Sequence, residues 1–113
     1  MTESIERVAT NLRRGVLEYC VLALLSREER YGLDLATELI ERSLIAGEGS
    51  LYPLLSRMRE SGSVETRVHA AGGGGRPRKY YAITEAGTAQ LASFAEVWQT
   101  IGGQVDQLLE GIR

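Results

Sequence analysis

The residues of this chain best suited to chemistry are cations gathered in one stretch, residues 47–81. Guanidinium and ammonium groups bind phosphate, and clusters of them are typical of proteins that bind nucleic acid. A run of four glycines, residues 72–75, divides the cluster into an earlier and a later part. This stretch therefore predicts phosphate binding, and its cations are Arg57, Arg59, Arg67, Arg76, Arg78 and Lys79.

The distribution of charge supports this interpretation, although the net charge of the 113-residue chain is only −2. Residues 1–47 carry six Arg against eight acids, a net −2, and residues 82–113 carry one Arg against four acids, a net −3. Residues 48–81 carry five Arg and one Lys against three acids, a net +3. Acidic flanks limit unspecific binding, so the positive segment is expected to make the contact with nucleic acid.

Other kinds of chemistry lack the residues that they need. His69 is the only histidine, Cys20 is the only cysteine, and no spacing typical of metal ligands or of a catalytic nucleophile occurs in the sequence. The glycine run neither precedes a helix nor ends in Gly-Lys-Ser/Thr, so it is not a nucleotide-binding phosphate loop. We therefore expect no enzyme activity, no metal and no cofactor.

The apolar runs of the chain are short. The longest, residues 16–25, is interrupted by Glu18 and is too short to span a bilayer, and the N-terminal residues are polar and charged. Cys20 within that run predicts a buried core residue, and a single cysteine allows no internal disulfide. We expect a cytoplasmic protein without a membrane partner.

Three helices are predicted in the first half of the chain. The apolar spacing indicates helices over about residues 10–25 and 31–42, and a third that begins between Gly47 and Ser50. Pro53 fits near the first turn of the third helix, and Gly62 is a typical residue at which to end it. The buried stripe of this helix is expected to be Leu51, Leu54, Leu55 and Met58.

A β-hairpin and a long helix are predicted in the second half. Val64, Thr66 and Val68 alternate with polar residues, the pattern of a half-buried strand, and a return strand is expected over about residues 78–84. Thr84 is expected to cap the last helix. Helix, strand, basic loop and strand in this order predict a mainly α protein with a small β-hairpin wing, a winged helix-turn-helix followed by a long C-terminal helix.

In a helix-turn-helix, the second helix of the motif enters the major groove of DNA. Ser50 and Tyr52 can donate hydrogen bonds to phosphates or bases, and Pro53 can contact a thymine methyl group. An arginine on this helix can bind guanine or phosphate, and cations on the wing can hold the backbone or the minor groove. The predicted contacts with double-stranded DNA are Ser50, Tyr52, Pro53, Arg57, Arg59, Arg76, Arg78 and Lys79.

The C-terminal helix carries a heptad seam. Its apolar residues are spaced alternately by three and four positions, which is typical of a helix that packs against a partner helix. Packing onto the first helix of the same chain is one interpretation, and a homodimer seam that involves both helices is the other. We expect a DNA-binding domain over residues 1–84 and a dimerisation helix over residues 85–113, with the seam Leu91, Phe94, Trp98, Ile101, Val105, Leu108 and Ile112.

The chain resembles the PadR family of bacterial transcriptional regulators over about residues 12–109. The matching blocks are LRRGVLEYCVLALL, YGLDLATEL, GEGSLYPLLSRMRESG and GRPRKYYAITEAG, and the single C-terminal helix is similar to that of the smaller subfamily. The resemblance implies a homodimeric winged-helix repressor that binds an inverted-repeat operator and is released by a small effector. It implies DNA contacts at Ser50, Tyr52, Pro53, Arg57, Arg76 and Lys79.

The same resemblance implies an effector site between the terminal helices of the dimer. Trp98 in the seam, with Phe94 one turn before it, can stack on an aromatic ligand, or it can simply fill the dimer core. Two other functions stay open at this point. One is a winged helix that docks onto a protein partner, which the unrelieved positive charge disfavours, and the other is a DNA binder without an effector.

Overall fold

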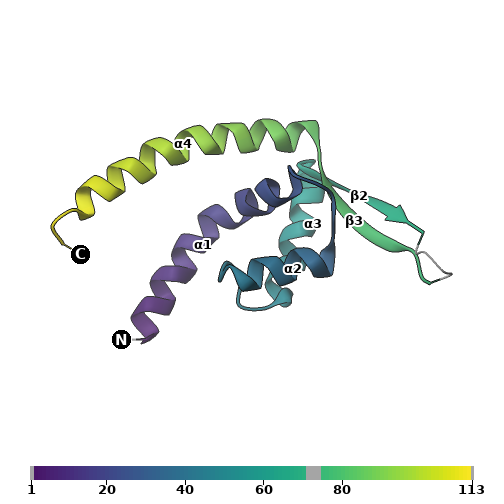
Figure 1. Ribbon diagram of the computed structural model, residues 1–113, viewed down its shortest axis with the longest axis horizontal. Helices are drawn as coiled ribbons and strands as arrows, with labels where there is room; N and C mark the ends of the chain where they lie inside the picture. The colour runs from purple at the N-terminus through teal and green to yellow at the C-terminus, as the bar shows by residue number, and fades with distance from the viewer. Residues whose placement is uncertain (1, 71–74, 113) are drawn as a thin grey trace.

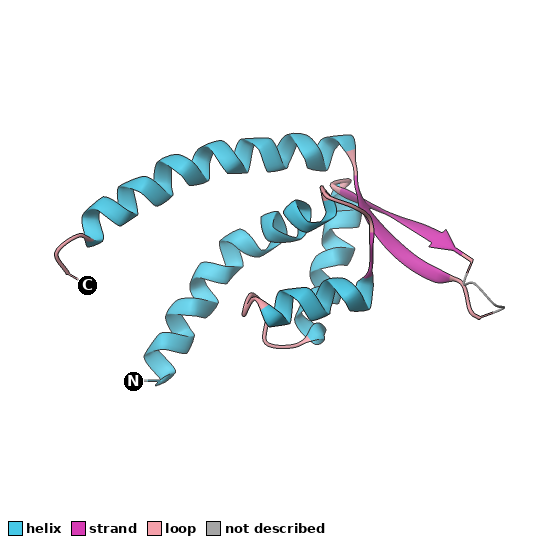
Figure 2. Ribbon diagram, viewed as in Figure 1, coloured by secondary structure: helices cyan, strands magenta, loops and turns pink. Residues whose placement is uncertain are grey.

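The computed structural model describes residues 2–70 and 75–112. The chain is mainly helical with one small antiparallel sheet, which confirms the predicted fold class (Figure 2). Four α-helices, one 3-10 turn and three strands follow one another in the order α1 (Thr2–Leu25), β1 (Arg30–Tyr31), α2 (Gly32–Glu41), the 3-10 turn Glu48–Ser50, α3 (Leu51–Ser61), β2 (Val64–His69), β3 (Arg78–Ile83) and α4 (Glu85–Leu109).

One hydrophobic core joins the last turns of α1 to α2 and α3. Leu22 of α1, Leu35 and Leu39 of α2, and Leu55 of α3 are fully buried in it. Cys20 is half-buried against this core, where burial raises the pKa of its thiol. Packing of amphipathic faces around such a core is what stabilises helices as short as α2 and α3.

Helix α3 follows the sequence pattern closely. The four residues of its predicted apolar stripe are the four that are buried. Gly62 ends the helix with a φ of 89°, in the left-handed region that favours glycine, and its N–H donates to the carbonyl of Arg59 at 3.1 Å. The 3-10 turn Glu48–Ser50 leads directly into α3, so Pro53 lies in the first turn.

The sheet has the order β1-β3-β2 and contains one strand more than the predicted hairpin. Tyr31, expected in the second helix, instead pairs with Tyr80 in the two-residue strand β1. The predicted burial of β2 is wrong at its outer end: Val64 is buried, whereas Val68 is 69% exposed. The hairpin projects beyond the helices there, so nothing covers its outer half (Figure 1).

Helix α4 starts beside the wing and runs back along α1. Thr84 caps it as predicted, because its Oγ1 accepts a hydrogen bond from the Gly87 N–H at 3.0 Å. Gly87 is required at that place, since a Cβ there would lie 2.1 Å from the carbonyl oxygen of Ser63. The rings of Tyr19 and Phe94 stack where α1 and α4 touch, with centroids 4.4 Å apart.

Helices α1 and α4 diverge toward the two termini of the chain (Figure 1). Helix α1 begins at Thr2, eight residues before the predicted start at about Thr10, so its first turns extend away from the body. Among residues 2–70 and 75–112, no helix combines the length and the apolar character that crossing a membrane requires.

Candidate nucleic-acid interface

Helix α3 presents an exposed surface on the side away from the core. Each residue turns about 100° around a helix axis, so Pro53, Ser56 and Glu60 lie opposite the buried stripe. Arg57 lies on one flank of the stripe and Arg59 on the other, and both are exposed. The predicted contacts of this helix therefore form one solvent-facing surface, with its two arginines at the edges.

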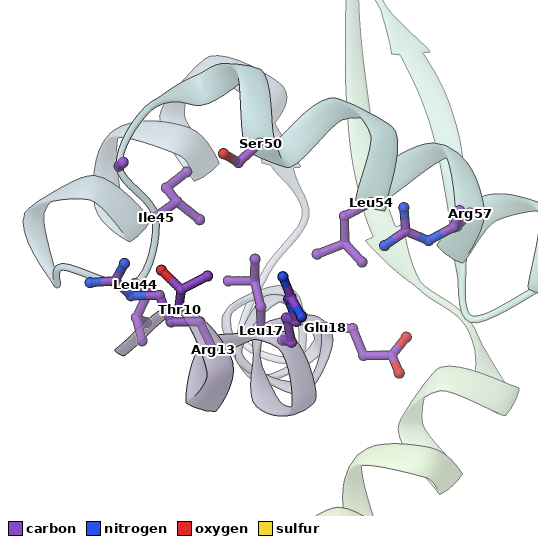
Figure 3. Close-up of a pocket in the computed structure, with 11 residues that line it drawn as sticks. Thr10, Arg13, Leu17, Glu18, Leu44, Ile45, Ser50, Leu54 and Arg57 are labelled. Atoms are coloured by element: carbon purple, nitrogen blue, oxygen red, sulfur yellow. The ribbon is translucent and has the colours of Figure 1, made fainter. Parts of the chain in front are cut away.

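The flank that carries Ser50 and Arg57 faces α1 across a cavity of about 470 Å³. Ser50 makes no capping hydrogen bond with its side chain, which leaves its hydroxyl available to a ligand. Figure 3 shows Ser50, Leu54 and Arg57 reaching this space from one side, while Leu17 and Glu18 of α1 reach it from the other. Sequence reasoning gave no role to Arg13 and Arg14, although both line the same cavity.

Tyr52 lies on the other flank and is 39% exposed, partly held by the body. A Cβ at Gly32 would lie 3.4 Å from Tyr52 Cε1 and 3.4 Å from Tyr81 Cε2, so the three residues are in close contact. Burial raises the pKa of the Tyr52 phenol, and the charge of Glu48 raises it further. Tyr52 therefore stays protonated at neutral pH and can donate a hydrogen bond from a fixed position.

The wing cations occupy different positions in the structure. The guanidinium of Arg78 lies over the ring of Tyr31, 5.1 Å from its centroid, and this cation–π contact orients it. Lys79 is exposed opposite Val68 in the β2–β3 register, and Arg76 is exposed just before β3. The predicted glycine-rich tip lies at residues 70–75, of which residues 71–74 are outside the described part of the chain.

One cation of the positive segment is neutralised by the protein itself. Arg67 forms ion pairs with Glu65 at 2.8 Å and Glu29 at 3.1 Å, and these hydrogen bonds raise the pKa of its guanidinium. His69 also contacts Glu29, and its ring meets the Tyr80 ring edge-on at 4.8 Å. Glu29, 38 residues before Arg67 in the chain, thus anchors the base of the wing to the turn after α1.

A second surface lies on α4, away from α3. The Phe94 and Trp98 rings stack with centroids 5.7 Å apart, and both line a groove of about 580 Å³ between α4 and α1. The first two residues of the predicted seam are used inside the chain, since Leu91 packs against the core and Phe94 against Tyr19. The other five are exposed: Trp98, Ile101, Val105, Leu108 and Ile112.

Comparison with known proteins decides the family. The sequence model of the PadR-like family of transcriptional regulators matches residues 21–93, which include α2, α3, the wing and the start of α4. The chain belongs to the PadR-like family. It is accordingly a transcriptional regulator and not an enzyme.

Relatives match this PadR-like chain over nearly its whole length. A PadR-like transcriptional regulator of Bacillus cereus is 40% identical, with a TM-score of 0.82 over 89% of this chain and 98% of that one. A PadR family regulator of Eggerthella lenta is 31% identical, with a TM-score of 0.81 over 97% and 96% of the two chains. An uncharacterized protein of Lysinibacillus sphaericus is 30% identical over 108 residues, 93% of this chain and 98% of that protein.

A more distant relative was solved on DNA. The structure of Bacillus subtilis PadR in complex with operator DNA is 25% identical, with a TM-score of 0.62 over 71% of this chain and 46% of that one. The similarity therefore concerns less than half of the Bacillus subtilis protein.

Proposed function

We propose that this PadR-like chain is a homodimeric, cytoplasmic repressor that binds an inverted-repeat operator and is released by a small aromatic effector. Residues 1–84 read the DNA and residues 85–113 hold the two copies together. Helix α3 enters the major groove through Ser50, Tyr52 and Pro53, and the wing follows the backbone or the minor groove. The Bacillus subtilis relative solved on operator DNA supports this reading mode.

The observation that carries the DNA proposal is how the protein pairs its charges. Away from α3 and the wing cluster, Arg30 and Arg42 are paired with Glu38, and Arg67 with Glu29 and Glu65. Within residues 2–70 and 75–112, no acid forms an ion pair with Arg57, Arg59, Arg76 or Lys79, and all four are exposed. Cations left without an internal partner are available to displace counterions from phosphate.

The uncovered apolar side chains support the homodimer. Soluble proteins seldom expose a continuous apolar surface of this kind without a partner. The stripe on α4 continues on the first turns of α1, where Ile5, Val8 and Leu12 are exposed at helical spacing. A second copy placed on these two helices would bury both stripes and would present two α3 helices to half-sites about 34 Å apart.

The groove between α1 and α4 supports the effector. Its volume of about 580 Å³ lies in the range of small-molecule sites, and it is mostly apolar. Trp98 is 53% exposed and already stacks on Phe94, so a flat aromatic ligand can extend the stack. A ligand wedged there would change the separation of the two α3 helices and so release the operator.

A fluorescence-anisotropy titration against the DNA upstream of the gene for this protein, at two salt concentrations, tests the proposal. We expect nanomolar binding that weakens steeply with salt and exceeds binding to random DNA by orders of magnitude. Equal affinity for both DNAs at both salts would favour a winged helix that docks onto a protein. Operator affinity unchanged by every aromatic compound tried would favour a binder without an effector.

A further inference from the structure

The cavity between α1 and α3 has a composition that the DNA-reading role does not require. It measures about 470 Å³, which lies within the range of small-molecule sites. Its polar groups are the guanidinium groups of Arg13, Arg14 and Arg57 and the hydroxyls of Thr10 and Ser50, and Glu18 is its single acid. The lining therefore carries three positive charges against one negative charge.

These arginines have no acidic partner within the protein. In the parts of the chain that the structure describes, no ion pair engages Arg13, Arg14 or Arg57. Guanidinium groups form strong, charge-assisted hydrogen bonds with carboxylate and phosphate. Three of them around one hollow make an anion the natural occupant.

The apolar part of the lining distinguishes among anions. Leu17 of α1, Leu44 and Ile45 of the segment after α2, and Leu54 of α3 contribute to the cavity (Figure 3). A DNA phosphate is hydrophilic on all sides and would gain nothing from these four side chains. An organic acid with an apolar body would place its carboxylate at the arginines and its carbon skeleton on the leucines and the isoleucine.

The dimer proposed above does not occupy this cavity. At about 100° per residue, the exposed stripe of Ile5, Val8 and Leu12 points to the side of α1 opposite that of Arg13 and Leu17. A copy that covers the stripe thus leaves the cavity open. The cavity is also separate from the Trp98 groove, since the two share no lining residue.

We propose that this cavity binds a small organic carboxylate with an apolar body, and that binding there opposes DNA binding. The second half of this statement rests on the proposed function, because it requires Ser50 and Arg57 to be DNA contacts. A carboxylate held by Arg57 competes with phosphate or base for the same guanidinium. The chain then has a ligand site within each reading domain, in addition to the groove on α4.

Titration of the full-length protein, without DNA, tests the site directly. Benzoate is the probe, benzamide is its uncharged match, and inorganic phosphate is an anion without an apolar body. We expect benzoate to shift the methyl NMR signals of Leu17, Leu44, Ile45 and Leu54, and to bind at least tenfold more tightly than either control. No methyl shift at millimolar benzoate would overturn the site, and equal binding of phosphate would reassign it to the DNA backbone.

A pair of variants of α1 locates the anion. Arg13→Gln should weaken benzoate binding roughly tenfold or more, because it removes a charge-assisted hydrogen bond. Arg7→Gln removes the same charge from the same helix outside the cavity, so it should leave benzoate affinity unchanged. Equal losses in the two variants would show that only the general charge of α1 matters, which contradicts the site.

Adding DNA separates this inference from the proposed function. Benzoate should weaken operator binding by the wild-type protein and by Arg7→Gln, while Arg13→Gln should bind the operator but respond much less. Benzoate binding without any change in operator affinity would overturn the competition and keep the site. Failure of the protein to bind DNA would refute the proposed function, and the methyl shifts would still decide the cavity.

Discussion

Leucines of the same chain have opposite surroundings in the winged-helix body and on the terminal helices. Leu55 of α3 is 0% exposed, whereas Leu108 of α4 is 76% exposed. The body combines α2, α3, the sheet and the last turns of α1 around one core. The free part of α4 and the first turns of α1 carry equally apolar side chains with nothing over them.

This difference separates what folds the chain from what assembles it. A core closed within one copy accounts for the stability of the reading surface. Apolar stripes left open on two diverging helices account for the association of two copies. The two regions should therefore respond differently to substitution, and the largest contrast concerns stability.

Leu55→Ala should have the largest effect. Removing a fully buried leucine from the body should cost about 2–5 kcal/mol of unfolding free energy, through lost apolar burial and a residual cavity. Val68→Ala on the exposed outer part of β2 is the control and should change stability by less than about 0.5 kcal/mol. Urea denaturation measures both, and similar losses in the two variants would contradict the body described here.

Trp98→Asp should act on association instead. A charge in the middle of the α4 stripe should weaken the dimer by at least about 2 kcal/mol, roughly 30-fold in Kd, while the helical circular dichroism stays native. Gln99→Asp adds the same charge to the neighbouring exposed residue, outside the seam, and should leave the dimer intact. Size-exclusion chromatography with light scattering distinguishes them, and a dimer that persists in Trp98→Asp would refute the seam.

Arg57→Ala should affect neither folding nor assembly but should weaken operator binding by about 1–3 kcal/mol. The reason is the exposed, internally unpaired guanidinium on the flank of α3. Arg7→Ala, a loss of the same charge on α1, should weaken binding much less. Anisotropy titrations compare the two, and unchanged affinity in Arg57→Ala would remove it from the interface.

Glu38→Gln should have the smallest effect, limited to the body. Hydrogen bonds from Arg30 and then Arg42 lower the pKa of the Glu38 carboxyl. A lowered pKa contributes stability above the unfolded value of about 4.3, and this stability is lost as pH falls through the folded value. The wild type should therefore melt slightly higher than the variant at pH 7, with the gap closing below about pH 4.

Thermal melts between pH 3 and pH 7 measure that gap. Glu41→Gln on the same helix is the control, because Glu41 takes part in no ion pair with the described residues. A gap between the wild type and Glu38→Gln that stays constant down to pH 3 would show that the ion pairs are not its cause.

Local pattern was enough to predict most of the fold. The stripe of α3, the Gly62 end and the Thr84 cap are short-range features that spacing and residue type specify, and the structure confirms them. Strand β1 has only two residues, too few to show any period, so Tyr31 was assigned to a helix. The exposure of Val68 depends on where the helices stop covering the wing, which alternation cannot show.

The candidate site divides in the same way. Which residues of α3 face outward follows from helical periodicity, so the sequence suffices for them. Two features depend on tertiary approach instead: the neutralisation of Arg67 by Glu29, and the meeting of Arg13 with Arg57 around one cavity. Residues so distant in the chain show no periodic relation, and only the folded structure brings them together.

The most direct test of the central claim, that two copies joined through α4 read one operator, is sedimentation velocity on a fluorescent inverted-repeat duplex from the promoter of this gene. The account predicts a single complex with two chains per duplex for the wild type. It predicts loss of that complex for Trp98→Asp at the same concentration. One wild-type chain per duplex, or an unchanged two-chain complex with Trp98→Asp, would contradict the claim.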